Sequence, residues 1–285
     1  MSSLMPILVG VLERGCMGSF LVMAFYLSSR IMKFDDFTLE GSFGLGGALA
    51  TFALLKDLNP WASLLLGMLG GAMAGALTAV LHSKFQFNKL IAGVVVATML
   101  FSVNLSLNGP NIALPSNKSI FNGINHWEYG ISIFLILFSL IGAAFLALFM
   151  KTEIGYLIKA TGLNRQFVTS LGKSTTFYLI LTLSLSNGMS ALAGGMMVQY
   201  AGFYSAFGNV GMLISALAGC ILGEIFNGPI YLMCIIGSML YQLIIAMTIE
   251  FQVNPSWQKL ITGLLIIFLL VLKKKDKGAI QYAQT

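Results

Sequence analysis

Acidic and hydroxyl side chains gather in one short stretch of an otherwise apolar chain. Between residues 35 and 42 they are Asp35, Asp36, Thr38, Glu40 and Ser42. Ionisable groups inside a membrane are costly and commonly mark ion or solute pathways, so this spacing favours the lining of a translocation pathway. The alternative is structural: the two aspartates lie in a solvated turn, and the acids complement the dipole of a helix that begins near Thr38.

A second polar stretch interrupts a long apolar segment at residues 174–200. It comprises Ser184, Ser186, Asn187, Gly188 and Ser190. Broken membrane helices occur where protein or water satisfies the freed backbone groups, and they often mark substrate sites. We therefore expect a first break at residues 29–36, before the helix that begins near Thr38, and a second break in this segment, where Ser186, Asn187 and Ser190 line the pathway. Asn104, in an earlier segment, either lines an outer vestibule or is a hydrogen-bonded interfacial residue.

The sequence shows no pattern typical of an enzyme or a metal site. It contains no HExxH or GxSxG motif, and its three cysteines are scattered through apolar segments. His82 and His126 stand far apart, which favours structural roles. Gly-Lys-Ser-Thr at residues 172–175 resembles the end of a phosphate-binding loop, but Phe167 stands where that motif requires glycine. We expect no catalytic residue, metal or nucleotide cofactor in this chain.

Composition places the chain in a membrane. It is 57% hydrophobic and 9% charged, whereas soluble domains average about 25% charged residues. A membrane-spanning helix needs about 20 apolar residues. The apolar segments are 5–28, 38–55, 60–81, 90–108, 129–150, 174–200, 206–223, 228–249 and 256–272. We predict one transmembrane domain over residues 1–285, an all-α polytopic helix bundle of about nine segments with broken helices, surrounded by the lipid bilayer.

Charges indicate how the loops and ends are oriented. Glu13 and Arg14 interrupt the first apolar segment, so we expect no cleavable signal there. Basic residues of short loops concentrate on the cytoplasmic side. Alternating crossings put 12 of the 16 basic residues on one face, including the loop 151–173 and the C-terminal tail with Lys273, Lys274, Lys275 and Lys277. We expect the N-terminus outside, the C-terminus inside, and no nucleic-acid partner, because orientation explains the net charge of +6.

Glycine spacing predicts close helix packing. Glycines recur every four residues on one face of the third segment and again in the seventh. They are Gly67, Gly71, Gly75, Gly219 and Gly223. Small residues at this spacing let membrane helices approach closely. A faint similarity between residues 59–71 and 209–220 favours pseudo-repeated halves, with chance similarity between two glycine-rich apolar helices as the alternative.

Four stretches together carry a family resemblance. Residues 34–48 read Phe-Asp-Asp-Phe-Thr-Leu-Glu-Gly-Ser-Phe-Gly-Leu-Gly-Gly-Ala, and residues 185–195 read Leu-Ser-Asn-Gly-Met-Ser-Ala-Leu-Ala-Gly-Gly. Between them lie Asn-Lys-Leu-Ile-Ala-Gly at 88–93 and Thr-Glu-Ile-Gly-Tyr-Leu-Ile-Lys-Ala-Thr-Gly-Leu-Asn-Arg at 152–165. In these stretches the chain resembles bacterial ABC importer permeases of the branched-chain amino acid and ribose type. It is most similar to the subgroup thought to take up aromatic amino acids (tryptophan or tyrosine), although Lys89 replaces that subgroup's usual proline.

The resemblance implies a set of partners and a docking loop. It implies a homodimer of permeases in the bacterial inner membrane, ABC ATPase subunits that bind ATP and magnesium, and a periplasmic or lipid-anchored binding protein that delivers the solute. By the same resemblance, the residues that couple the loop 151–173 to the ATPase are Gly155, Lys159, Ala160, Thr161, Gly162, Asn164, Arg165 and Gly172.

Two other functions stay open. One is an ABC importer of a sugar or nucleoside, which would share the same architecture. The other is an ion-coupled secondary transporter that works alone. It would need an internal ion site, and Asp35, Asp36 and Glu40 form the acidic cluster that could supply one.

Overall fold

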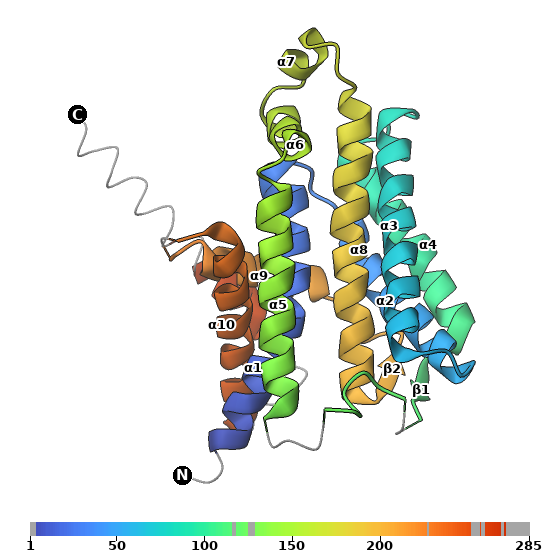
Figure 1. The fold of residues 1–285 in the computed structure, drawn as a ribbon, viewed down its shortest axis with the longest axis vertical. Helices are drawn as coiled ribbons and strands as arrows, with labels where there is room; N and C mark the ends of the chain where they lie inside the picture. The colour runs from blue at the N-terminus through green and yellow to red at the C-terminus, as the bar shows by residue number, and fades with distance from the viewer. Residues whose placement is uncertain are drawn as a thin grey trace, which may run out of the picture.

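The computed structural model describes residues 4–115, 118–124, 129–226, 228–251, 257, 260–268 and 271. Within these residues the chain is a bundle of helices with one small sheet (Figure 1). The elements are α1 Leu4–Phe25, η1 Tyr26–Ile31, α2 Thr38–Leu55, α3 Pro60–Ser83, α4 Lys89–Asn108, β1 Asn111–Ala113, α5 Gly130–Phe149, α6 Glu153–Leu163, α7 Arg165–Ser170, α8 Thr175–Ala201, β2 Phe203–Ser205, α9 Met212–Gly223 and α10 Ile230–Glu250. The all-α polytopic bundle predicted from the sequence is confirmed.

Seven helices are long and apolar enough to span a membrane, rather than the nine segments predicted. The seventh predicted segment, 206–223, contains only the short helix α9 of 12 residues. At about 1.5 Å per residue, such a helix covers roughly 18 Å, short of the roughly 30 Å hydrocarbon core. Part of the ninth segment, together with the basic tail, lies outside the described residues. Residues 260–268 are helical.

The first predicted break is present between α1 and α2. The helix widens into the π-helix η1, and residues 32–37 are not helical. Lys33 adopts a φ of 55°, which turns the chain. The Asp36 carboxylate accepts a hydrogen bond from the backbone N–H of Thr38 at 2.9 Å, and α2 begins there. An acceptor at this place satisfies one of the free N–H groups of the first helical turn.

The second predicted break, at residues 184–190, is wrong. α8 is one continuous α-helix of 27 residues. Its polar side chains bond without opening the backbone: the Ser186 hydroxyl donates to the Leu183 carbonyl at 3.2 Å, and the Asn187 amide donates to the same carbonyl at 2.9 Å. The non-helical backbone follows α8 instead. It begins at Gly202, with a φ of 72°, and runs to the start of α9.

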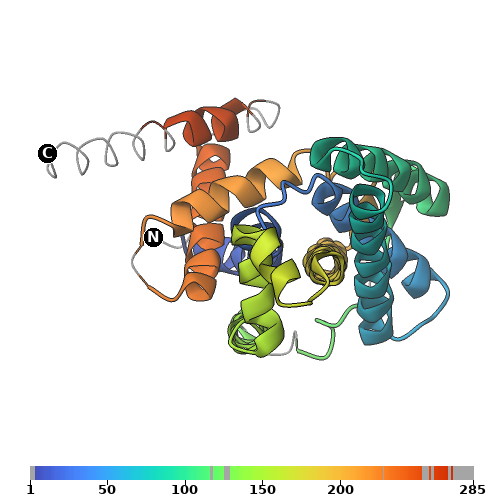
Figure 2. The same cartoon turned by 90° about the horizontal axis from the view of Figure 1, so that it is seen from above.

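The glycines of α2, α3 and α8 bring three helices into backbone contact, as predicted for the third segment. A Cβ added to Gly75 would lie 2.0 Å from the Leu183 carbonyl oxygen, and one added to Gly46 would lie 1.9 Å from that of Ala191. Seen from above, α8 stands end-on near the middle of the molecule, where it contacts α1, α2 and α3 (Figure 2). Among the described helices, α2, α3 and α8 make the most extensive contacts with one another.

The two ends of the bundle differ. α6 and α7 project at one end of the bundle (Figure 1). At this end the Lys89 ammonium donates to the Lys33 carbonyl at 2.9 Å, so the loops that carry these two basic residues lie together. At the opposite end, β1 pairs with β2 in antiparallel register, with Ile112 opposite Tyr204. We call these the α6–α7 end and the strand end. Residues 59–71 and 209–220, whose similarity suggests a repeat, lie mainly in α3 and α9, and these two helices differ in length. A repeat of the two halves stays a prediction.

Candidate functional site

Three of the predicted pathway residues meet between α2 and α8. The Asn187 amide nitrogen donates to Oδ2 of Asp36 at 2.6 Å, and the Ser42 hydroxyl donates to the Asn187 amide oxygen at 2.7 Å. All three residues are buried. Two sequence stretches that are 151 positions apart therefore form one hydrogen-bonded polar cluster, which we call the Asp36 cluster.

Further hydroxyl groups extend this cluster along the helices. The Ser190 hydroxyl donates to the Leu39 carbonyl at 2.7 Å, and the hydroxyls of Thr38 and Thr78 are 2.7 Å apart. These groups are fully buried. Buried polar groups that are all paired rigidify a core and specify its register. In this conformation the cluster fastens α2 to α3 and α8.

The acidic residues of the first stretch do not share one site. Asp35 is exposed, whereas Asp36 is buried. Burial raises the pKa of Asp36 above its usual value of 3.8, and hydrogen bonds from Asn187 and Thr38 oppose that shift. The Glu40 carboxylate points elsewhere and accepts from the backbone N–H of Gly211 at 3.0 Å, where α9 begins.

One asparagine holds the non-helical stretch against α2, and another joins α4 to α2. The Asn209 amide donates to the Glu40 carbonyl at 3.4 Å, and the Asn104 amide donates to the Gly41 carbonyl at 3.4 Å. Within the described part of the chain, Oδ1 of each of these asparagines is buried and has no hydrogen-bond partner. Gly44 leaves room for both amides, since a Cβ there would lie 2.5 Å from one and 2.7 Å from the other.

A cavity that the sequence analysis did not identify opens beside this stretch. Its volume is about 680 Å³, and its walls come from α1, α2, α5, α8 and residues 203–212 at the strand end. The polar and aromatic side chains in its walls include Glu13, Arg14, Phe43, Tyr200, Phe203 and Tyr204. Ligand cavities are typically about 300–1,000 Å³, mostly apolar, with a few polar groups. The signal was in the sequence: two adjacent charges inside an apolar segment.

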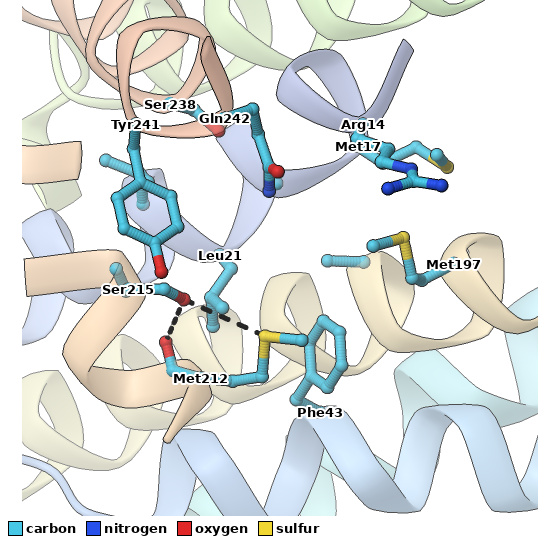
Figure 3. A pocket seen from close by; sticks show the side chains of 14 residues that line it. Arg14, Met17, Leu21, Phe43, Met197, Met212, Ser215, Ser238, Tyr241 and Gln242 are labelled. Carbon is cyan, nitrogen blue, oxygen red and sulfur yellow. Dashed lines mark hydrogen bonds between the residues drawn. The ribbon is translucent and has the colours of Figure 1, made fainter. Parts of the chain in front are cut away.

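The two charged residues in the cavity wall behave differently. Glu13 is buried, and its carboxylate accepts from the Ser132 hydroxyl at 2.6 Å and the Tyr200 hydroxyl at 2.7 Å. Arg14 is exposed in the isolated chain, and it also interacts with Tyr200. Figure 3 shows an adjoining pocket of about 30 Å³, in which the Arg14 guanidinium extends from α1 toward Met197 of α8.

The loop 151–173 folds into α6 and α7. Several of its predicted coupling residues have structural roles: Thr161 donates its hydroxyl to the Leu157 carbonyl at 2.7 Å, and Asn164 caps α7 by accepting from Phe167 N–H at 3.1 Å. Gly155 is buried, and a Cβ on Gly162 would lie 2.0 Å from the Ile31 carbonyl oxygen. These contacts shape the loop, and of the four residues only Asn164 is exposed.

The loop also has an exposed surface. Asn164, Arg165 and Gly172 are exposed, and Lys159 and Ala160 are half-buried, with the Lys159 ammonium 5.4 Å from the centre of the Tyr156 ring. Large apolar side chains that the sequence analysis missed are also exposed. They are Ile154, Tyr156, Leu163, Phe167 and Leu171.

Comparison with known proteins finds similar transport permeases. A family model described as "Branched-chain amino acid transport system / permease component" matches residues 7–270. A tyrosine transport system permease protein of Clostridioides difficile is 33% identical over 269 residues, which cover 92% of this chain and 90% of that protein. The autoinducer 2 import system permease protein LsrC of Salmonella typhimurium is 28% identical over 77% of this chain and 63% of that protein.

One solved structure is also similar. It is described as PsaBC from Streptococcus pneumoniae in complex with Fab, and it gives a TM-score of 0.49 at 12% identity. The likeness covers 92% of this chain and 89% of that chain.

Proposed function

The chain belongs to the family of permease components of branched-chain amino acid transport systems, and we propose that it forms the membrane path for an amino acid, with an aromatic one favoured. The observation that carries the proposal is the family match over residues 7–270 together with 33% identity to a tyrosine transport permease. The chain is a membrane-spanning subunit of an ABC importer, with seven apolar helices to cross the bilayer.

The partners follow from membership of this family. In our proposal, ATPase subunits bind Mg-ATP and drive transport, a periplasmic or lipid-anchored binding protein delivers the solute, and a second permease copy completes the path. The strand end faces outward and the α6–α7 end faces the cytoplasm, which puts the N-terminus outside. Support comes from the basic loops, since Lys33, Lys89 and Arg165 lie close together at the α6–α7 end, and basic loops favour the cytoplasmic side.

The ATPase docks on α6 and α7 in this proposal. Leu163 is 73% exposed and Phe167 is 53% exposed. Each is a large apolar side chain that has a polar, solvent-facing residue beside it in the sequence. Contiguous exposed apolar groups mark protein interaction sites. Gly162→Arg, a variant suggested by the family motif, would disrupt the contact of α6 with Ile31 and so cannot separate docking from folding.

The test is co-purification of the ATPase from mild detergent. We expect wild-type permease to retain the ATPase, and Leu163→Asp with Phe167→Asp to lose it while the elution volume of the permease stays unchanged. Leu58→Asp is the matched control, because Leu58 is exposed like the other two but lies in the turn between α2 and α3, away from α6 and α7. If the control and the double variant retain equal amounts of ATPase, α6 and α7 are not the docking surface.

A solute of another class is the second candidate. The relative from Salmonella typhimurium is an autoinducer 2 import permease, and a sugar or nucleoside importer would use the same fold. Uptake of radiolabelled L-tyrosine, ribose and uridine into proteoliposomes with the complete transporter distinguishes the two. We expect ATP-dependent uptake of L-tyrosine. If the transporter takes up ribose or uridine but no L-tyrosine, the proposed solute becomes a sugar or a nucleoside instead of an amino acid.

An ion-coupled transporter is less well supported. In the described part of the chain, no three His, Cys, Asp or Glu residues form a group that could hold a metal ion. Asp35, Asp36 and Glu40, which were the candidate ligands, have separate surroundings: one is exposed, one bonds to Asn187, and one bonds to Gly211. Transport by the purified permease alone, driven by an ion gradient, would revive this candidate.

A further inference from the structure

Arg14 lies deep in a membrane helix. It is the eleventh residue of α1, which has 22 residues. At about 1.5 Å per residue it stands roughly 15 Å from the start of the helix, near half the thickness of the hydrocarbon core. A guanidinium group at this depth is costly unless it faces a polar group or a water-filled cavity. Its position therefore needs an explanation in the structure around it.

The neighbouring acid does not supply that explanation. Glu13 is held by the Ser132 and Tyr200 hydroxyls, on the side of α5 and α8. Arg14, the next residue, also interacts with the Tyr200 hydroxyl and shares the cavity wall with Glu13, but a hydroxyl group supplies no negative charge. The ion pairs between described residues are Arg30–Glu224, Lys118–Asp57 and Lys173–Glu153, and none of them includes Arg14.

Cavities surround Arg14 instead. It lines the cavity of about 680 Å³ at the strand end, and it also lines neighbouring pockets that α10 bounds, of about 200 and 320 Å³. The large cavity combines this one exposed cation with aromatic rings from three elements: Phe43 of α2, Tyr200 of α8 and Phe203 of β2. Phe203 is 55% exposed, so its ring is available to a ligand.

We propose that the cavity at the strand end is a solute-binding site in which Arg14 binds the carboxylate of an aromatic amino acid and Phe203 contacts its ring. The inference rests on the proposed import of amino acids and names the site within the permease. Arginine binds carboxylates through two parallel hydrogen bonds, which are stronger than neutral ones. The solute's carboxylate supplies the negative partner that Arg14 lacks among the described side chains, and the aromatic walls favour a flat apolar side chain.

The test is equilibrium binding of tritiated L-tyrosine to the full-length permease in lipid nanodiscs. Tyramine, which lacks the carboxylate, and L-tyrosine methyl ester, whose carboxyl group is neutral, serve as competitors. We expect each to displace the label from wild type at a concentration at least tenfold higher than unlabelled L-tyrosine. In Arg14→Gln the advantage of L-tyrosine over both competitors disappears, and Arg14→Lys retains part of it.

Matched variants separate this role from folding. Lys118→Gln also removes one positive charge, from the loop near the strand end, and Lys118 bonds to Asp57 rather than lining the cavity; we expect wild-type competition. Phe203→Ala keeps Arg14 and should reduce the preference for L-tyrosine over L-alanine. It therefore tests the site even if Arg14→Gln does not fold, as judged by elution volume and thermal midpoint.

Two results would overturn the inference. One is a folded Arg14→Gln variant that still prefers L-tyrosine over tyramine as strongly as wild type does. This result would overturn the inference whether or not the variant still forms a permease dimer. The other is no binding of L-tyrosine to wild type. Either result leaves the proposed function standing if the complete transporter still imports L-tyrosine. If the complete transporter imports no amino acid, the proposed function itself fails.

Discussion

The side-chain amide of Asn187 in α8 donates a 2.6 Å hydrogen bond to the carboxylate of Asp36, the residue that positions the first turn of α2. One contact thereby joins the start of one membrane helix to the middle of another. Both residues are buried, and the Ser42 hydroxyl completes the surroundings of the Asn187 amide. The polar residues that the sequence placed in the pathway act here as a connection between helices.

Asp36 and Asn187 should be energetically coupled. Either single variant already breaks the charge-assisted hydrogen bond that the two residues share, so the double variant should lose less stability than the sum of the two single variants. We therefore expect a double-mutant cycle with Asp36→Ala and Asn187→Ala to give a coupling free energy of about 1–2 kcal/mol. Chemical unfolding in detergent micelles, followed by circular dichroism, measures it. Additive losses within error would show that the contact contributes no stability of its own.

The stability of the protein should depend on the protonation of Asp36. Burial holds its pKa in the folded state above the ordinary 3.8, so the folded protein binds this proton more tightly than the unfolded chain does. This contribution to stability is fully present below pH 3.8 and is lost as pH rises through the folded pKa. Asp36→Asn should flatten the dependence of the unfolding midpoint on pH in that window. An unchanged slope would contradict the assignment.

Gly46 should tolerate no larger residue. In Gly46→Ala the new methyl group would overlap the backbone of Ala191, and we expect a loss of about 1–3 kcal/mol from overpacking. Gly10→Ala is the matched control, because no heavy atom lies within 4 Å of a Cβ there and alanine favours the helix by about 1 kcal/mol. Thermal midpoints in the same detergent should shift in opposite directions. A similar shift in both variants would argue against tight packing at Gly46.

The ion pair between Arg30 and Glu224 should be weak and sensitive to salt. Two contacts, of 2.7 and 3.2 Å, join the end of η1 to the end of α9, but the arginine side chain is 39% exposed. We expect a coupling of about 0.5–1 kcal/mol between Arg30→Gln and Glu224→Gln, most of it lost at about 1 M salt. The more exposed pair Lys173–Glu153, at 3.6 Å, should show almost no coupling at either salt concentration. Equal coupling in the two pairs would contradict this ranking.

Hydropathy was sufficient to predict most of the membrane helices. Long apolar runs mark α3, α5 and α10 within a few residues, because apolar length is what a bilayer requires. The method failed at residues 206–223, where composition is apolar but the chain becomes helical only at Met212. There, Asn209 and Gly211 bond to Glu40, a residue about 170 positions away in the sequence. Contacts over such a separation leave no local pattern.

The predicted interruption of α8 failed for a related reason. Serine and asparagine compete with the backbone for hydrogen bonds and so suggest a break. In the fold, Ser190 bonds to Leu39 of α2 and Asn187 bonds to Asp36, which lies just before α2, and the helix stays intact. The sequence shows Arg14 as a charge within an apolar segment. Whether Arg14 can bind a ligand depends on the cavity beside it, whose walls include residues from 203 to 212.

The close contact of α2, α3 and α8 restricts how this transporter can move. Where helices touch through backbone atoms at Gly46, Gly75 and Gly194, no side chains are available to change rotamer and let one helix slide past another. These three helices should therefore move together as one rigid body. The hinge would lie where longer side chains fill the contacts, between this rigid body and the helices α1, α9 and α10, along the wall that carries Arg14.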